Sequence, residues 1–105
     1  MVFFEHPIFV RQRKGTIDAA GMVSLITLLT DRPDAGVLIP AGGGLRKLRV
    51  AAKGKGKGGG ARVDYYWKSK DSVITFLSVY AKNQKADLTR RELNFFRNLI
   101  EDNEP

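Results

Sequence analysis

The chain has 105 residues, of which 18 are lysine or arginine and 11 are aspartate or glutamate, giving a formal net charge of +7. This length predicts one domain over residues 1–105. The absence of cysteine excludes disulfides, thiolate metal sites and cysteine nucleophiles. The most apolar stretch, residues 17–29, is shorter than the ~20 residues that span a bilayer, so we expect no membrane partner. The amino terminus lacks a signal-peptide pattern, and we therefore expect a cytoplasmic protein.

The first part of the chain predicts a short strand followed by helices. Residues 2–4 favour a strand, and Pro7 is expected to open a turn or a short helix. A broad apolar stripe predicts a longer helix, which we expect Thr16 to cap and which should run to about Thr30. Residues 33–44 contain two sets of proline and glycine turn signals, so they predict a connection rather than an element.

Three strands are expected next, over residues 45–51, 62–68 and 73–80. Alternation along a strand assigns each side chain to a face. One face of the first strand carries Leu45, Lys47 and Arg49, and the other carries Arg46, Leu48 and Val50. In the second strand one face carries Arg62, Asp64 and Tyr66, and the other carries Val63, Tyr65 and Trp67.

The helix expected at the carboxyl end has the clearest sequence signals. Thr89 and Glu92 have the spacing of a capping box, and the apolar residues that follow recur at helical spacing. The order of elements therefore predicts an α+β fold. We expect a twisted, mainly antiparallel sheet of about four strands, with helices near the amino terminus and one helix at the carboxyl end.

The positive charge is concentrated in one part of the chain. Residues 42–70 contain nine basic residues and one acidic residue, a net charge of +8, whereas the remainder has a net charge of −1. Three aromatic residues, at positions 65–67, lie in the same segment. Such a block favours binding to a polyanion, most simply a nucleic acid. The alternative is a solvated basic loop that only improves solubility.

Glycine and lysine alternate in the middle of this block. Residues 54–59 satisfy the pattern GxGxxG, but a strand rather than a helix is expected to follow, which argues against a dinucleotide site. The chain has no P-loop motif. We interpret this segment as a thin loop that presents Lys53, Lys55 and Lys57 to a phosphate backbone.

Few other residues suggest catalysis. The single histidine, His6, favours a structural or exposed role, and the scattered carboxylates predict no metal site. Asp64 is the one acidic residue in the basic block. We expect it to form an ion pair with Arg62 or Lys68, although a role in proton transfer is the alternative.

Several segments together resemble one family. They are residues 43–49 (GGLRKLR), 53–57 (KGKGK), 61–67 (ARVDYYW), 79–83 (VYAKN) and 87–89 (DLT). Their combination is similar to HigB-type toxins of the RelE/ParE toxin superfamily, over roughly residues 33–93. The resemblance implies a RelE-like α+β fold and cleavage of mRNA in the ribosomal A site, without a metal or cofactor. It also implies a cognate antitoxin, a helix-turn-helix HigA-like protein through which operator DNA would be bound.

The resemblance also implies roles for particular residues. The expected catalytic residues are Arg62, Lys53, Lys55 and Lys82. For RNA binding, the resemblance points to Lys57 and Asn83. The basic block itself suggests Arg46, Lys47 and Arg49 as phosphate contacts and Tyr66 as a residue that stacks on a base, with core packing as the alternative for Tyr66. Three positions in two segments depart from the family pattern. Leu88 and Thr89 stand where many relatives carry a catalytic tyrosine, and Asp64 stands where relatives usually have an aliphatic residue.

Two further functions fit the same fold. A ParE-like inhibitor of DNA gyrase would share the architecture without nuclease chemistry. A catalytically impaired RNA-binding module would bind RNA with salt-sensitive affinity and leave it intact.

Overall fold

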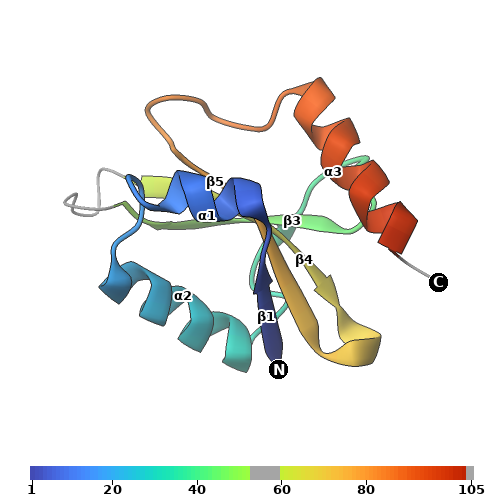
Figure 1. The fold of residues 1–105 in the computed structure, drawn as a ribbon, viewed down its shortest axis with the longest axis horizontal. Helices are drawn as coiled ribbons and strands as arrows, with labels where there is room; N and C mark the ends of the chain where they lie inside the picture. Colours follow the sequence, from blue (N-terminus) through green and yellow to red (C-terminus); the bar gives the residue numbers. More distant parts are fainter. Residues whose placement is uncertain (53–59, 104–105) are drawn as a thin grey trace.

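The computed structural model describes residues 1–52 and 60–103, which form a five-stranded sheet and three α-helices (Figure 1). The strands are β1 (Val2–Glu5), β2 (Val37–Leu38), β3 (Leu45–Ala51), β4 (Gly60–Lys68) and β5 (Val73–Ala81). Their order across the sheet is β1-β5-β4-β3-β2. Only the β1–β5 pair is parallel among these strands. The predicted α+β fold with a mainly antiparallel sheet is therefore confirmed.

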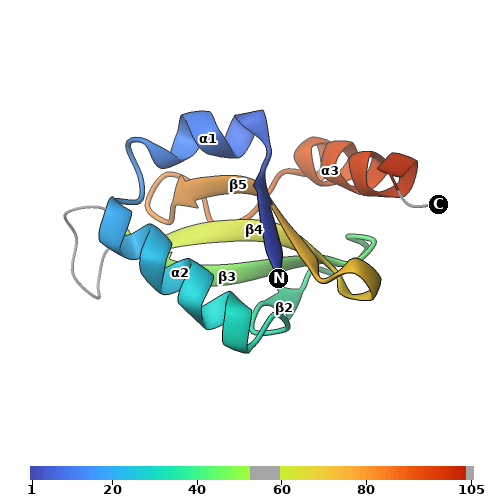
Figure 2. The same ribbon diagram turned by 60° about the horizontal axis from the view of Figure 1, so that its bottom comes forward.

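The helices cover both faces of the sheet. They are α1 (Pro7–Arg13), α2 (Ala19–Asp31) and α3 (Arg90–Asn103), and a 3-10 helix (Ser69–Asp71) joins β4 to β5. α2 packs on one face, α3 packs on the other, and α1 lies beside β5 (Figure 2). Two clusters of buried apolar side chains result. The larger includes Phe9, Leu25, Leu29, Val63, Tyr65 and Phe76, and the smaller consists of Leu45, Leu77, Phe96 and Ile100.

The first two helices begin at side chains that accept backbone hydrogen bonds. His6 Nδ1 accepts from the Ile8 N–H at 3.1 Å, which gives the histidine the structural role expected for it. The cap of α2 differs from the prediction. Asp18 accepts from the Gly21 N–H at 2.8 Å, whereas the Thr16 hydroxyl donates to a carbonyl of α1. A carboxylate three residues before a free N–H is an equally good cap, and it starts the helix later.

The predicted capping box of α3 is confirmed. The Thr89 hydroxyl accepts from the Glu92 N–H at 3.1 Å, and the Glu92 carboxylate accepts from the Thr89 N–H at 2.8 Å. Phe96 and Ile100 are buried one turn apart on the face that contacts the sheet. The connection between β5 and α3, residues 82–89, therefore ends at a firmly set helix start.

The strand β2 lies in a segment expected to be only a connection. It pairs with Arg46 and Lys47 of β3 and forms an edge of the sheet. The Tyr65 hydroxyl holds the preceding turn, since it accepts from the Gly36 N–H and donates to the Pro33 carbonyl, both at 2.8 Å. A strand of two residues has no sequence pattern of its own, so contacts distant in sequence determine it.

Within the described part of the chain, none of the helices combines the length and the apolar character needed to cross a membrane.

The Tyr65 hydroxyl should contribute measurably to stability. Tyr65→Phe leaves a buried N–H and a carbonyl without their partner, which should lower the free energy of unfolding by about 1–3 kcal/mol. Urea unfolding followed by circular dichroism measures the loss. Tyr80→Phe is the comparison variant, because the Tyr80 hydroxyl is buried beside the Asp64 carboxylate and makes no hydrogen bond of standard geometry to the backbone among the described residues. Equal losses in the two variants would contradict this role of Tyr65.

Candidate active site

The pairing of β3 with β4 gathers basic side chains on the face that α3 partly covers. Arg49 pairs with Arg62, and Lys47 pairs with Asp64, in an antiparallel register. Side chains that are directly opposite in such a pair lie on the same face. The predicted faces of the two strands are thus confirmed, and three cations, Lys47, Arg49 and Arg62, lie within two residues of one another along the ladder.

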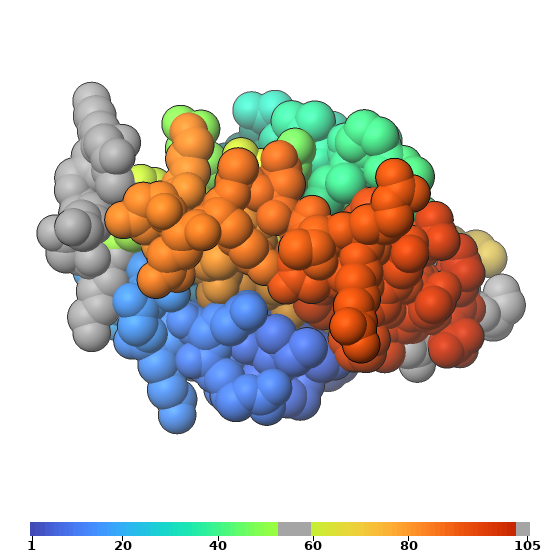
Figure 3. Space-filling view, turned by 90° about the horizontal axis from the view of Figure 1, so that it is seen from above, coloured from blue at the N-terminus to red at the C-terminus, as the bar shows by residue number. Residues whose placement is uncertain are grey.

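Two of these cations converge on one carboxylate oxygen. The Lys47 Nζ is 3.1 Å from Asp87 Oδ1, and Arg62 Nη1 is 3.0 Å from the same atom. Hydrogen bonding from Lys47, with a further contribution from Arg62, holds the pKa of Asp87 below its usual value. Asp87 belongs to the connection between β5 and α3, which Figure 3 shows in orange at the surface, between α1 in blue and α3 in red. The position of Asp87 Oδ1 is therefore an anion site.

The remaining candidates near this site lie where the strands end. Arg49 is exposed and forms no ion pair within the described residues. Lys82 and Asn83 follow β5 directly, in an exposed turn that starts with the Lys82 N–H donating to the Gly60 carbonyl at 3.0 Å. β5 ends at Ala81, one residue beyond Tyr80, the partner of Arg62. Lys82 and Asn83 thus belong to the same end of the sheet as Arg49 and Arg62.

Asp64 does not form the expected ion pair with Arg62 or Lys68. Its side chain is fully buried beneath the basic cluster and accepts from the Ser78 hydroxyl at 2.8 Å. Arg62 and Lys68 instead pair with Asp87 and Asp71. The prediction failed because the strand pattern assigns Asp64 to the correct face but does not indicate that α3 and the connection cover that face.

Burial raises the pKa of Asp64 to about 6, although Ser78, Tyr80 and the nearby Arg62 all favour the ionised form. Burial and the Asp64 charge in turn raise the pKa of Tyr80 above its usual value. Asp64 Oδ1 and the Tyr80 hydroxyl are both buried and lie close enough for each to shift the pKa of the other, although no hydrogen bond of standard geometry satisfies either atom among the described residues. The layer below the cations is therefore polar and incompletely satisfied, a pattern that occurs more often at functional sites than in structural cores.

Lys85, which the sequence analysis did not identify, also lies next to the buried layer of Asp64 and Tyr80. Its Nζ lies 4.7 Å from the centre of the Tyr80 ring and bonds both oxygens of Glu92, at 2.7 and 2.6 Å. Lys85 therefore fixes the β5–α3 connection against the first turn of α3. No motif marks it, because its partners come together only when the connection folds over the end of β5.

Two other predicted RNA-binding residues lie apart from Lys47 and Arg62. Arg46 points to the opposite face, where its guanidinium donates to the carbonyls of Asp34 and Gly36 at 3.2 and 2.7 Å. Tyr66 shares the face of Arg62 but is half-buried and packs against the smaller core cluster. Arg46 thus holds the turn before β2, and Tyr66 contributes to the packing under α3.

The predicted loop lysines, Lys53, Lys55 and Lys57, lie outside the described residues. Among residues 1–52 and 60–103, no three histidine, aspartate or glutamate side chains are grouped so that they could hold a metal ion.

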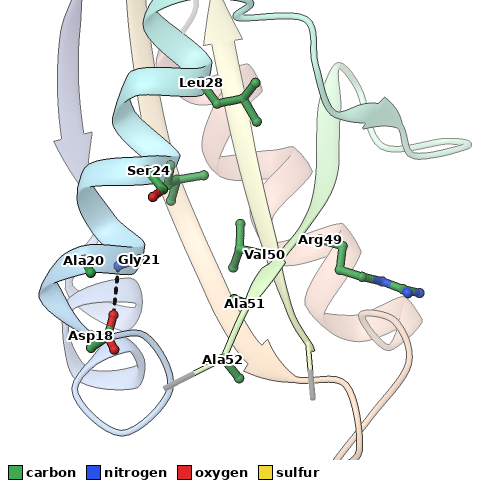
Figure 4. Close-up of a pocket in the computed structure, with 10 residues that line it drawn as sticks. Asp18, Ala20, Gly21, Ser24, Leu28, Arg49, Val50, Ala51 and Ala52 are labelled. Atoms are coloured by element: carbon green, nitrogen blue, oxygen red, sulfur yellow. Dashed lines mark hydrogen bonds between the residues drawn. The ribbon is translucent and has the colours of Figure 1, made fainter. Parts of the chain in front are cut away.

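A groove between α2 and β3 is a less suitable active site. It is lined mainly by small and apolar residues, including Gly21, Leu25, Leu28 and Val50 (Figure 4). The Asp18 carboxylate beside it is occupied by capping α2, and the Arg49 side chain points away from α2. The groove therefore lacks paired acids or bases, and the basic residue that borders it, Arg49, points away from α2, so the cluster on the opposite face is the candidate site.

The buried acid predicts a pH-dependent stability. Because the pKa of Asp64 is raised to about 6 on folding, its contribution to stability is complete below about pH 4 and is lost as the pH rises through 6. Asp64→Asn stays neutral, so its free energy of unfolding relative to that of the natural chain should increase by about 2 kcal/mol between pH 4.5 and 7.5. Urea unfolding at each pH measures this difference, with exposed Asp71→Asn as the control for lost charge. A difference in free energy of unfolding between the two chains that stays constant or shrinks with rising pH would contradict the raised pKa of Asp64.

Residues 2–103 match the family described as the RelE toxin of the RelE / RelB toxin-antitoxin system. The match includes all strands and helices described above, and with them Lys47, Arg62 and Asp87. Toxins of this family are generally mRNA endonucleases that inhibit translation, and each acts with a cognate antitoxin. The chain therefore belongs to the RelE family, as the toxin of a toxin–antitoxin system.

Proposed function

We propose that this toxin is a HigB-type, ribosome-dependent mRNA interferase that cleaves mRNA in the ribosomal A site. The observation that carries the proposal is the convergence of Lys47 Nζ and Arg62 Nη1 on a single anionic oxygen. Donors held in place by a sheet stabilise negative charge without rearranging during the reaction. Arg49, directly opposite Arg62, adds a second guanidinium for the same RNA backbone.

The chemistry that suits this site uses the RNA itself as the nucleophile. The 2′-oxygen attacks the adjacent phosphorus and loses its proton to a base. The bond to the 5′-oxygen of the next nucleotide breaks, and that oxygen takes a proton. The products are a 2′,3′-cyclic phosphate and a free 5′-hydroxyl, and no metal or cofactor takes part. The protein has to align the attacking and leaving oxygens and to neutralise the charge that develops on phosphorus, which is the role we assign to Arg62 and Arg49.

Proton transfer is assigned to lysine. Lys53 and Lys55 are the candidates from the family resemblance, and Lys82, which follows the end of β5, is assigned an assisting role. The ribosome is expected to complete the alignment of the mRNA, and the toxin therefore acts in the cytoplasm. A helix-turn-helix, HigA-like antitoxin would neutralise it and would carry the complex to operator DNA.

Primer extension on a defined mRNA in a purified translation system tests the proposal. Cuts at A-site codons are expected only when ribosomes are present. Arg62→Ala should reduce their rate by about 100-fold or more, since it removes a principal donor to the transition state. Lys70→Ala removes the same charge in the 3-10 helix at the far end of β4 and should cleave normally.

The same assay separates the alternatives. An Arg62→Ala variant that cleaves like the natural chain would contradict the assignment of Arg62. Intact mRNA beside an active control toxin would contradict nuclease activity. A parallel assay of DNA supercoiling by gyrase would then distinguish a gyrase inhibitor from a protein that only binds RNA.

A further inference from the structure

The Asp87 carboxylate stands where a substrate phosphate would have to bind. Its Oδ1 accepts from both Lys47 and Arg62, the two cations assigned to the RNA backbone. Carboxylate and phosphate oxygens compete for the same lysine and guanidinium donors, at similar distances. Only 14% of the Arg62 side chain is exposed and its Nη1 already donates to Asp87, so a phosphate that binds this donor has to take the position of Asp87.

The segment that carries Asp87 is secured on either side of it. At one end, the backbone N–H groups of Gln84 and Lys85 donate to the Ala81 carbonyl, and Lys85 is paired with Glu92. At the other end, the capping box fixes Thr89. Within the described chain, residues 86–88 between these anchors make no backbone hydrogen bond. Leu88 packs against the smaller core cluster and holds the backbone beside Asp87, so it is the exposed Asp87 side chain that can turn away from the cations without disturbing the sheet or α3.

The exposure of Asp87 differs from that of the buried acid in the same cluster. Asp64 is fully buried and cannot meet a substrate, whereas 59% of the Asp87 side chain is exposed. An exposed ion pair contributes little to the stability of a fold, because water competes for both partners. The two ion pairs of Asp87 are thus weak enough to exchange for a polyanion that brings several phosphates.

We propose that Asp87 is a built-in competitor of the RNA: its carboxylate occupies the phosphate position of the site and is displaced when the substrate binds. This inference rests on the proposed function, because it takes Lys47 and Arg62 as the phosphate-binding residues. The Asp87 carboxylate makes the affinity for RNA lower than the affinity that the basic cluster would have without it. A substrate that is aligned and concentrated by a larger assembly displaces the carboxylate more easily than a free strand does.

The affinity of the whole chain for a short RNA tests the inference. The probe is a fluorescein-labelled, 2′-O-methylated RNA octamer, which lacks the attacking hydroxyl, and binding is followed by fluorescence anisotropy. Asp87→Asn should bind about 3- to 10-fold more tightly than the natural chain, since it removes one exposed competing charge. Asp71→Asn is the matched control, because Asp71 is 56% exposed and pairs with Lys68 at 3.2 Å. It should change the affinity less than 2-fold.

A second pair of variants shows whether the gain depends on the site. In an Arg62→Gln background, Asp87→Asn should give no further tightening. Binding that depends on Arg62, with Asp87→Asn no tighter than Asp71→Asn, would overturn the inference and leave the proposed site intact. Weaker binding by Asp87→Asn would also overturn it, because Asp87 would then be a positioning residue for the cations. Natural-chain binding that is absent, or that does not change in Arg62→Gln, would overturn the phosphate site and the inference together.

Discussion

The register between β3 and β4 is the constraint on which the candidate site depends. It sets Arg49 opposite Arg62 and Lys47 opposite Asp64, so that the cations share a face. A shift of one residue would send the side chains of one strand to the other face. The register is fixed because Val63 and Tyr65 are fully buried on the α2 side, while Leu45 is fully buried under α3. The core and the cluster are thus two results of the same pairing.

The cluster is also shaped by the acids around it. Asp64 lies beneath the cations and is kept from solvent, while Asp87 lies over them and is exposed. Asp87 pairs with Lys47 and Arg62, and the charge of Asp64 acts on Arg62, so the two carboxylates offset positive charge in different ways. Because Asp64 is buried, dissolved salt screens its charge poorly. Asp87 is exposed, so another anion can take its place. A surface with an exchangeable anion position suits a protein of this family, whose members are generally endonucleases that inhibit translation.

Much of the fold could be predicted from local patterns. Alternation gave the faces of β3 and β4 correctly, and the capping box located the start of α3. The strand β2 could not be predicted, because its two residues are held by Tyr65 and β3 rather than by a pattern of their own. The predicted cap of α2 was wrong. Several polar residues precede that helix, and only packing decides which of them caps it.

The candidate site was predicted only in part. Composition and resemblance pointed to Lys47, Arg49 and Arg62, which the sheet brings together. Arg46 belongs to the same run of charge, yet alternation sends it to the other face, where it binds carbonyls. Asp87 was noted only as part of the DLT segment of the resemblance, without a role, and Lys85 was missed, because only tertiary folding brings them to the cations and to Tyr80.

The side-chain NMR signals of the arginines, followed during titration with the same methylated RNA octamer, test where the RNA binds. If the face under α3 carries the phosphate site, the Nε–H signals of Arg62 and Arg49 shift together and saturate at one RNA concentration. The Arg46 signal, from the opposite face of the same strand, stays in place. Shifts at Arg46 with none at Arg62 would contradict the assignment of the RNA surface to the Lys47, Arg49 and Arg62 cluster.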